Sequence, residues 1–393
     1  MNQPPAPNPN PAAWREELAR HRIVKIALKR VRSRYPRLYG KNSRLPEHSY
    51  GIEFLVEEIE TDQGARGWAF DGAYDPARAA PEVFRPFLGK RIAQLFDPQA
   101  GILEDASRPL DFALHDLAGQ ILGLPVSRLI HAPAASEVAC YDGAIYMNDI
   151  SPDSRPGGLA AVLENCRQDA ALGYRAFKLK IGRGGRWMEP EAGLRRDIEV
   201  TQMVRRHFPD HPILVDGNDA FTLPDLLRYI DAVADVGLYW IEEPFPENRE
   251  DLLRLRDHLA KRSPATLIAD GEYDPDVNFM LDLAAEGLVD VLLMDIHGLG
   301  FTRWRRLQEQ IVRRGFRVSP HNWGAKLKTH YTAHLAAAYP NFTMIEGVPD
   351  ETEGVAFDAY ALRDGMLCLP ERPGFGMELI WGRPLWEISE KSQ

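Results

Sequence analysis

Acidic or basic residues end seven of the short apolar runs in the second half of this 393-residue sequence. Such runs are typical of buried β-strands. The set consists of Lys178 with Lys180, Asp216, Glu242, Glu272, Asp295, His321 and Glu346, and from Lys180 onward the steps are 36, 26, 30, 23, 26 and 25 residues. Each step is close to one βα repeat. Because the carboxyl ends of barrel strands meet at one mouth, the spacing predicts that these side chains converge.

Three carboxylates in this series, Asp216, Glu242 and Glu272, follow successive predicted strands. Brought together, they would repel one another unless a cation joined them. A set of oxygen ligands suits a hard ion such as Mg²⁺, with water and substrate completing its coordination. The alternative is that each acid is a solvated strand end or a helix cap. The common register of the three favours a metal site.

Two lysines precede the carboxylates by one strand. Lys178 and Lys180 alternate with the apolar residues Phe177, Leu179 and Ile181. In a strand this alternation directs both lysines to one face, so we expect them to point into the site while the apolar side chains pack on helices. A nearby cation lowers the pKa of an ammonium group, so Lys178 would help Lys180 to act as a neutral base. The alternative is a pair of surface lysines on an edge strand.

A histidine and an aspartate form a second candidate acid/base group. His321 follows Pro320 at the end of its predicted strand, and Asp295 ends the strand before it. A carboxylate at that position would orient the imidazole and raise its basicity, opposite the lysines. A structural role for His321 is the alternative, and His297, two residues after Asp295, competes for the same function.

From about Val138 the sequence alternates short apolar runs with amphipathic helical segments. This pattern predicts an α/β fold, a modified (β/α)8 (TIM) barrel, over residues 135–355. The eight strand candidates are EVACYDGA, RAFKLKIG, ILVDGN, YWIEEP, TLIADGE, DVLLMDI, FRVSPHN and FTMIEG. Alternation within them places Asp216 and Glu242 on one face of their strands, away from Val215 and Ile241.

The residues before the barrel have a different pattern. Prolines at positions 4, 5, 7, 9 and 11 predict a disordered tail over residues 1–20. Strand-like apolar runs follow at Ile23–Val31 and Ile52–Ile59, and a helical pattern extends from Pro81 to about Ile130. We therefore expect a separate α+β domain over residues 21–134.

The composition limits the classes of partner. A formal charge of −10 argues against general affinity for nucleic acid or anionic lipid. No apolar run approaches the roughly 18 to 20 residues that span a bilayer, and the first residues do not have the pattern of a signal peptide. Three cysteines that are far apart in the sequence indicate a reducing compartment. We therefore expect a cytoplasmic protein that acts on a small molecule.

The ordered set of motifs resembles the enolase superfamily, and within it the mandelate racemase subgroup of mandelate racemase/muconate lactonizing enzyme-like acid sugar dehydratases. The motifs are DFALHDLAGQILGLPVSRLI, Lys178-Leu179-Lys180, Val215-Asp216-Gly217-Asn218, Ile241-Glu242-Glu243-Pro244, Gly271-Glu272, Ile345-Glu346 and LPERPGFGMEL. Asp295–Thr302 is one residue shorter than the usual pattern of the family. The resemblance implies a homo-oligomer in which the N-terminal domain caps the barrel and the segment 356–393 returns to complete that cap.

The resemblance also implies a role for each candidate residue. Asp216, Glu242 and Glu272 correspond to the Mg²⁺ ligands, Lys180 to the base on one face and the Asp295/His321 pair to the base or acid on the other. A protonated Glu346 and Lys178 would lie beside the substrate carboxylate, and Asn218 is a candidate contact to the substrate. Mg²⁺ would stabilise the ene-diolate that forms when an α proton leaves.

Residues 29–44 reverse the charge of this acidic chain, with seven basic residues and no acidic one. In the family, the loop between the first cap strands covers the barrel mouth, so Arg34, Arg37, Lys41 and Arg44 are candidate contacts to a second anionic group of the substrate. The alternative is that they pair with acids of a partner subunit or stay solvated.

These expectations lead to one preferred function and two alternatives. The preferred function is Mg²⁺-dependent dehydration of an acid sugar, with a diacid as one option, to a 2-keto-3-deoxy acid. A lysine base that faces a histidine acid suits both steps of this elimination. The first alternative is a racemase or epimerase of a 2-hydroxy acid that uses the same pair, and the second is a non-catalytic binding protein on the same fold.

Overall fold

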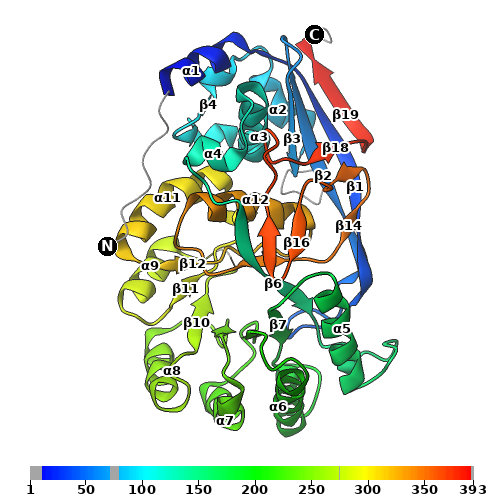
Figure 1. Ribbon diagram of the computed structural model, residues 1–393, viewed down its shortest axis with the longest axis vertical. Helices are drawn as coiled ribbons and strands as arrows, with labels where there is room; N and C mark the ends of the chain where they lie inside the picture. Colours follow the sequence, from blue (N-terminus) through cyan, green and yellow to red (C-terminus); the bar gives the residue numbers. More distant parts are fainter. Residues whose placement is uncertain (1–10, 71–78, 274, 391–393) are drawn as a thin grey trace.

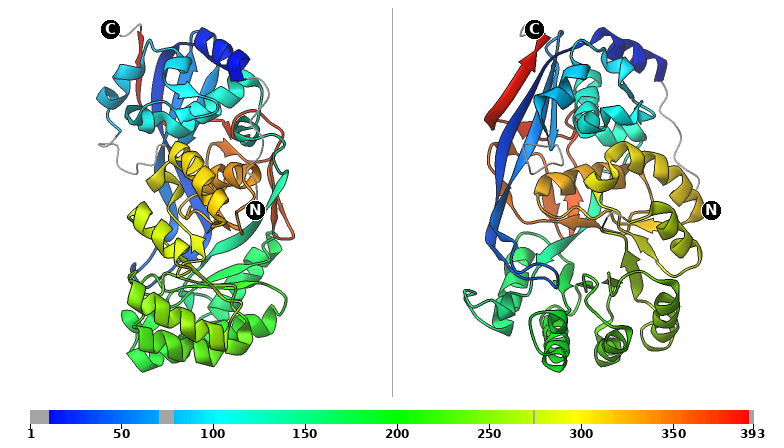
Figure 2. Two further views of the ribbon diagram at one scale, coloured as in Figure 1. Left: turned by 90° about the vertical axis from the view of Figure 1, so that its left-hand side faces the viewer. Right: turned by 180° about the vertical axis from the view of Figure 1, so that it is seen from behind.

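The computed structural model describes residues 11–70, 79–273 and 275–390 (Figure 1). Two sheets organise the chain: an antiparallel sheet near both ends of the sequence, and a parallel sheet formed by the middle. Figures 1 and 2 show the first sheet and its helices above the helices α6 to α8 of the second part. The N-terminal domain therefore caps an α/β domain.

The cap sheet has the order β14-β1-β2-β3, and β19 also pairs with β1. Its bounds are β1 Ile23–Tyr39, β2 Ser49–Thr61, β3 Arg66–Phe70, β14 Glu351–Thr352 and β19 Arg383–Ser389. Strand β3 packs closely on helix α3 (Asp111–Leu122), because a Cβ atom at Gly67 would lie 2.5 Å from the Cα of Leu117. The C-terminal strand thus completes the cap next to the N-terminal strand, as the resemblance implied.

The start of the chain differs from the prediction. Helix α1 covers Pro11–Arg20 and buries Leu18 completely, so the expected tail is wrong for residues 11–20; residues 1–10 lie outside the described residues. Strand β1 is also longer than predicted and includes three arginines that were expected in a loop. The alternation explains the extension, since Val31, Ser33 and Tyr35 are buried while the side chains between them are exposed.

The rest of the cap is less helical than the sequence pattern suggested. Before α3 lie the short helix α2 (Pro81–Phe84) and a small hairpin of β4 (Phe96–Asp97) and β5 (Gly101–Ile102). Helix α4 (Val126–Ile130) then leads to the parallel sheet. Among the described residues, no helix is long and apolar enough to cross a membrane.

The parallel strands follow one another in the order β6 to β12, and β13 pairs in parallel with β6. Their bounds are β6 Glu137–Ile145, β7 Phe177–Lys180, β8 Ile213–Asp216, β9 Trp240–Glu242, β10 Leu267–Asp270, β11 Val291–Leu292, β12 Arg317–Val318 and β13 Ile345–Gly347. Seven of them lie within the predicted segments, and β6 extends one residue beyond its segment, to Ile145. One isolated bridge, between Val318 and Phe342, connects β12 to the segment that precedes β13.

Helices connect these strands. They are α5 Leu159–Ala171, α6 Pro190–His207, α7 Leu223–Val233, α8 Arg249–Arg262, α9 Val277–Ala285, α10 Ile296–Leu299, α11 Phe301–Arg314 and α12 Lys326–Ala338. After β13 the chain continues into β14 of the cap, β15 (Val355–Ala356), β16 (Ala361–Arg363), β17 (Met366–Cys368) and β18 (Glu378–Leu379). After the last parallel strand, β13, the described chain therefore has short strands where a regular βα unit would have its helix.

The predicted faces of the strands are confirmed by two separate apolar clusters. Phe177, Leu179 and Val215 belong to the large cluster that also contains helix residues such as Leu226. Leu214, Trp240 and the neighbouring strand residues form a small cluster of their own. Side chains two positions apart in a strand point the same way, so the face of this small cluster is shared by Lys178, Lys180, Asp216, Glu242 and Glu346.

Candidate active site

The three predicted metal ligands meet at the carboxyl ends of β8, β9 and β10. Asp216, Glu242 and Glu272 are buried, and one oxygen of each lies within 4.8 Å of the others. Glu242 Oε2 accepts a hydrogen bond of 3.0 Å from the indole of Trp240, which fixes its orientation. Within the described part of the chain, the buried Glu272 Oε2 has no hydrogen-bond partner. Three converging carboxylates, one of which has an oxygen that accepts no hydrogen bond, supply the kind of oxygen ligands that Mg²⁺ prefers.

The two lysines of β7 face these carboxylates. Lys178 Nζ lies 2.6 Å from Glu242 Oε1 and 2.9 Å from Glu346 Oε1, and Lys180 Nζ is paired with Asp216. Burial alone would lower the pKa of Lys180, and Lys178 lowers it as well, but Asp216, Glu272 and Glu242 together outweigh both effects and raise it. The expectation of a neutral Lys180 is therefore wrong for the metal-free arrangement, because the carboxylates around it, Asp216 first, outweigh the effect of the second lysine.

His321 and Asp295 form the predicted pair. His321 Nδ1 lies 2.8 Å from Asp295 Oδ2, and Nε2 lies 3.4 Å from Glu272 Oε1. Burial would lower the pKa of His321, but Glu272 and Asp295 outweigh this effect and raise it. Asp295 is anchored by Lys328 Nζ at 3.0 Å and by two backbone N–H groups of α10, which its Oδ1 caps. The pair is thus held in place, with Nε2 directed toward the carboxylates.

The competing histidine lies elsewhere. His297 stacks on Phe112 of the cap at 4.1 Å between ring centroids, and its Nε2 donates a 3.1 Å hydrogen bond to the carbonyl of Phe70. Burial lowers its pKa to about 3, so the ring is neutral at physiological pH. His297 therefore connects the cap to the α/β domain and does not reach the carboxylates.

Glu346 lies between the two acid/base groups. It contacts Lys178, accepts a 3.0 Å hydrogen bond from the backbone of Asn322, and has Oε2 4.0 Å from His321 Nε2. Gly143 of β6 makes room for it, since a Cβ there would lie 2.4 Å from Glu346 Oε1. Burial would raise the pKa of Glu346, but Lys178 and His321 outweigh it and lower the pKa. The expected protonated form is therefore wrong, because two cations stabilise the carboxylate.

Asn218 and Arg44 lie beside the metal ligands. The Asn218 backbone donates to Asp216 Oδ1 at 2.9 Å, and its amide nitrogen donates to Glu243 at 3.3 Å. Arg44 pairs with Asp219, donates to the Asn218 carbonyl at 3.3 Å, and has its guanidinium 3.6 Å from the ring centroid of Tyr273. Of the four basic candidates, Arg44 is thus joined directly to the segment that carries the ligands.

The other three basic candidates have different partners. Arg34 pairs with Glu353 and is largely exposed, while Lys41 lies over the ring of Trp187 at 5.3 Å and bonds to the carbonyl of Pro46. Arg37 binds both oxygens of the buried Asp169 on α5. The guanidinium of Arg37 therefore connects β1 to helix α5 of the α/β domain, and the expectation that it contacts a ligand is not supported by its position.

We expect Arg37→Ala to weaken folding and to leave substrate binding unchanged. The substitution leaves Asp169 as a buried carboxylate without its guanidinium, which costs about 3 to 5 kcal/mol. Denaturant unfolding of the variant measures this loss, and the KM of the folded fraction should equal that of the wild type. A variant of normal stability with a raised KM would contradict this assignment.

His48 is a site residue that the sequence analysis missed. It comes from the segment between β1 and β2, and its ring lies 4.5 Å from Tyr146 and 4.7 Å from Trp323, centroid to centroid. Its Nδ1 donates to the carbonyl of Gly40 at 2.8 Å, and burial together with Lys180 lowers its pKa to about 4. A neutral imidazole thus lies close to Lys180. No local pattern marks this residue, because its position depends on how the cap docks.

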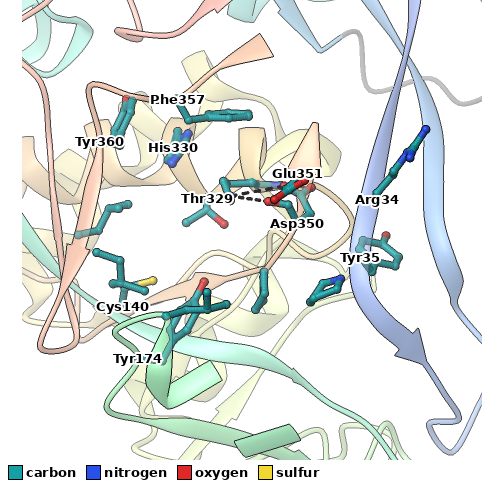
Figure 3. A pocket seen from close by; sticks show the side chains of 16 residues that line it. Arg34, Tyr35, Cys140, Tyr174, Thr329, His330, Asp350, Glu351, Phe357 and Tyr360 are labelled. Atoms are coloured by element: carbon teal, nitrogen blue, oxygen red, sulfur yellow. Dashed lines mark hydrogen bonds and ion pairs between the residues drawn. The ribbon is translucent and has the colours of Figure 1, made fainter. Parts of the chain in front are cut away.

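A separate cavity of about 530 Å³ lies outside strands β6 and β13 (Figure 3). Cys140, Thr329, His330 and Tyr360 are among its lining residues, and none of the predicted site residues except Arg34 is. The Thr329 hydroxyl donates to the backbone carbonyl of Glu346 at 2.9 Å, so the cavity is behind the strand that carries this residue. The candidate active site is therefore the cluster of carboxylates and cations inside the sheet.

Comparison with known proteins agrees with this architecture. Residues 161–382, more than half of the chain, match the family model described as enolase C-terminal domain-like. A galacturonate dehydratase from a Geobacillus species, solved with D-galacturonate and 5-keto-4-deoxy-D-galacturonate, has 32% sequence identity and a TM-score of 0.85, and the match covers 92% of this chain and 95% of that one.

Two further relatives extend the comparison. A mandelate racemase/muconate lactonizing protein from Geobacillus, solved with magnesium and tartrate, has 31% identity and a TM-score of 0.84 over 92% of this chain and 93% of that chain. The D-galactarolactone cycloisomerase of Agrobacterium fabrum is 26% identical over 361 residues, which cover 83% of this chain and 88% of the relative. The chain therefore belongs to the enolase superfamily, among the proteins that resemble mandelate racemase and muconate lactonizing enzyme.

Proposed function

We propose that the protein is an acid sugar dehydratase that removes the proton α to a carboxylate and eliminates the β-hydroxyl group as water. The observation that carries this proposal is the arrangement of Lys180 and His321 around one carboxylate cluster, with Lys180 at Asp216 and His321 Nε2 at Glu272. The galacturonate dehydratase that is similar to this chain supports the reaction class.

The residues at the site would hold Mg²⁺ through Asp216, Glu242 and Glu272. When bound, the ion would attract the substrate carboxylate and stabilise the negative charge that develops on its oxygens. We also infer that the eight parallel strands close into a barrel that lacks its last helix, since β13 pairs with β6 and Val318 bridges to Phe342. Such a closed barrel brings all these strand ends to one mouth.

The protein groups divide the proton transfers between them. Lys180 accepts the α proton at Nζ in its neutral form, which it would reach once Asp216 serves as a metal ligand and no longer pairs with the ammonium group. Lys178 keeps a positive charge near the substrate carboxylate. His321, whose pKa is raised, donates the proton on Nε2 to the leaving hydroxyl group. Asp295 holds Nδ1–H and stabilises the imidazolium before this transfer. The resulting enol tautomerises to a 2-keto-3-deoxy acid.

The racemase alternative uses the same two groups without a leaving group. Incubation of candidate acid sugars with the protein and Mg²⁺ in D₂O separates the two reactions. A dehydratase yields a keto acid that reacts with semicarbazide, whereas a racemase exchanges the α proton and forms no keto acid. Exchange without keto acid over a library of mono- and diacid sugars would reject the proposed elimination and favour an isomerase.

We expect Arg44→Gln to distinguish a diacid substrate from a monoacid. A charge-assisted hydrogen bond contributes about 1.5 to 3 kcal/mol, so KM for a diacid should rise about tenfold or more, while KM for a matched monoacid should change little. Arg34→Gln is the control, because Arg34 is exposed and pairs with Glu353 away from the ligands. Equal KM values in wild type and Arg44→Gln for every diacid that turns over would remove Arg44 as a substrate contact.

A further inference from the structure

A cavity of about 590 Å³ lies between the cap and the barrel, away from the carboxylate cluster. It is lined by helix α11, the end of α12, the end of α4, Arg15 of α1 and the turn between β4 and β5; Figure 1 shows α11 beneath α4. Its charged lining consists of Arg15, Arg305, Arg306, Arg313, Asp97 and Glu309. In a chain with a net charge of −10, this is a local excess of positive charge.

Arg305 is a buried cation without a carboxylate partner among the described residues. Its side chain bonds to three neutral acceptors: Nε2 of His115 at 2.9 Å and the carbonyls of Pro98 and Gln99 at 2.7 and 3.0 Å. The buried Nε has no hydrogen-bond partner in the described ranges. Burial lowers the pKa of Arg305, in contrast to the buried, carboxylate-paired Arg183, whose pKa is raised. Tyr339, Asp111 and Asp97 raise this pKa but do not outweigh burial, so the buried charge is only partly compensated.

Gln308 is an independent indication of a missing partner. It lies three residues after Arg305 on the same face of α11, lines the same cavity and is completely buried. Neither its amide oxygen nor its amide nitrogen has a hydrogen-bond partner in the part of the chain that the structure describes. Buried polar side chains are almost always hydrogen-bonded, so two orphaned atoms in one cavity call for a polar occupant.

The acids of the cavity do not supply this partner. Asp97 already pairs with Arg15 and caps the backbone N–H groups of Gln99 and Ala100. The side chain of Glu309 is 74% exposed and lies 3.9 Å from Arg313. Neither acid of the cavity therefore pairs with Arg305 or bonds to Gln308, and the positive charge there can interact with a bound anion.

We propose that this cavity binds a small organic oxyanion, a phosphate- or carboxylate-bearing molecule, which joins the cap to α11. Guanidinium groups match the geometry of phosphate and carboxylate oxygens, and an amide nitrogen adds a neutral donor. The volume is in the range of small-molecule sites rather than that of a lone ion. Arg305, Arg306 and Gln308 contact the anion, and the bound molecule stabilises the folded protein because the unfolded chain does not bind it.

Thermal unfolding of the full-length protein tests the site without any turnover, so its result is independent of the proposed dehydration. Inorganic phosphate and succinate are titrated against chloride at matched ionic strength. We expect a saturable rise in Tm with at least one of the two anions. Binding of phosphate alone, or of succinate alone, supports the site and identifies the preferred anionic group.

Gln308→Leu is the decisive variant. It removes both orphaned polar atoms, so it should raise Tm without anion and weaken the Kd for the anion about tenfold or more. Arg306→Gln should weaken binding in the same way if Gln308→Leu fails to fold. Arg314→Gln is the control on the same helix, because Arg314 is exposed and lies over Phe316. A response to phosphate and succinate equal to that of chloride, or an unchanged Kd in Gln308→Leu and Arg306→Gln, would overturn the proposal.

Discussion

Lys180→Ala is expected to lower kcat by about two to four orders of magnitude, the range that a positioned general base contributes. The ammonium group lies at Asp216 on the inner face of β7, and in the described ranges the only other lysine at the carboxylate cluster is Lys178. Lys178 Nζ is held between Glu242 and Glu346, at 2.6 and 2.9 Å, so it cannot take over as base. Steady-state formation of keto acid with added Mg²⁺ measures the loss.

The exchange of the α proton in D₂O shows which step is lost. Lys180→Ala should abolish both exchange and elimination, whereas His321→Asn should abolish elimination and retain part of the exchange, because Lys180 still removes the proton. Lys261→Ala, an exposed residue at the end of α8, is the control and should behave as wild type. Wild-type rates in Lys180→Ala would refute its role as base, and folding is checked by circular dichroism.

Asp216→Asn is expected to raise the Mg²⁺ concentration for half-maximal activity more than about 100-fold. Loss of a residue that only supports a metal ligand lowers metal affinity by up to about 100-fold, and loss of a ligand itself should cost more. The substitution removes one of three converging carboxylates and also the counter-charge of Lys180. Exhaustive chelation of the wild type should abolish activity, and Mg²⁺ should restore it. Calorimetric titration with Mg²⁺ reports the affinity without turnover.

Asp257→Asn provides the matched control, because Asp257 is an exposed acid on α8. This variant should keep the wild-type response to Mg²⁺. Full activity of the wild type after chelation, or an unchanged Mg²⁺ requirement in Asp216→Asn, would show that the three carboxylates do not hold the metal. The base and acid assigned to Lys180 and His321 would then need a different way to stabilise the developing charge.

The fold and the centre of the site could be predicted because they depend on local regularities. The spacing of Asp216, Glu242 and Glu272 follows the length of a βα unit, and the alternation of Lys178 and Lys180 with apolar residues follows the period of a strand. Both patterns are properties of short segments, and a parallel sheet with helices on its outside turns them into convergence at one edge. The structure brings these residues together accordingly.

The charge states could not be predicted from the same patterns. The carboxylates around Lys180, Asp216 first, set the direction of its pKa shift, and Lys178 and His321 lower the pKa of Glu346. Such effects depend on distances of a few ångströms between side chains from different strands. The electrostatic energy changes steeply over these distances in a buried site, and the distances cannot be read from the order of residues along the chain.

The sequence by itself determined the repeating α/β architecture, the converging acids and bases, and the family. Only the tertiary structure decided which basic residues of the cap reach the site: Arg44 lies beside the metal ligands, Arg37 is bound to Asp169, and the unpredicted His48 lies near Lys180. The physical reason is the range of the interactions. Hydrophobic periodicity acts over a few residues, whereas these contacts join the cap to segments of the α/β domain more than a hundred residues away. Their geometry exists only when both domains are folded and docked.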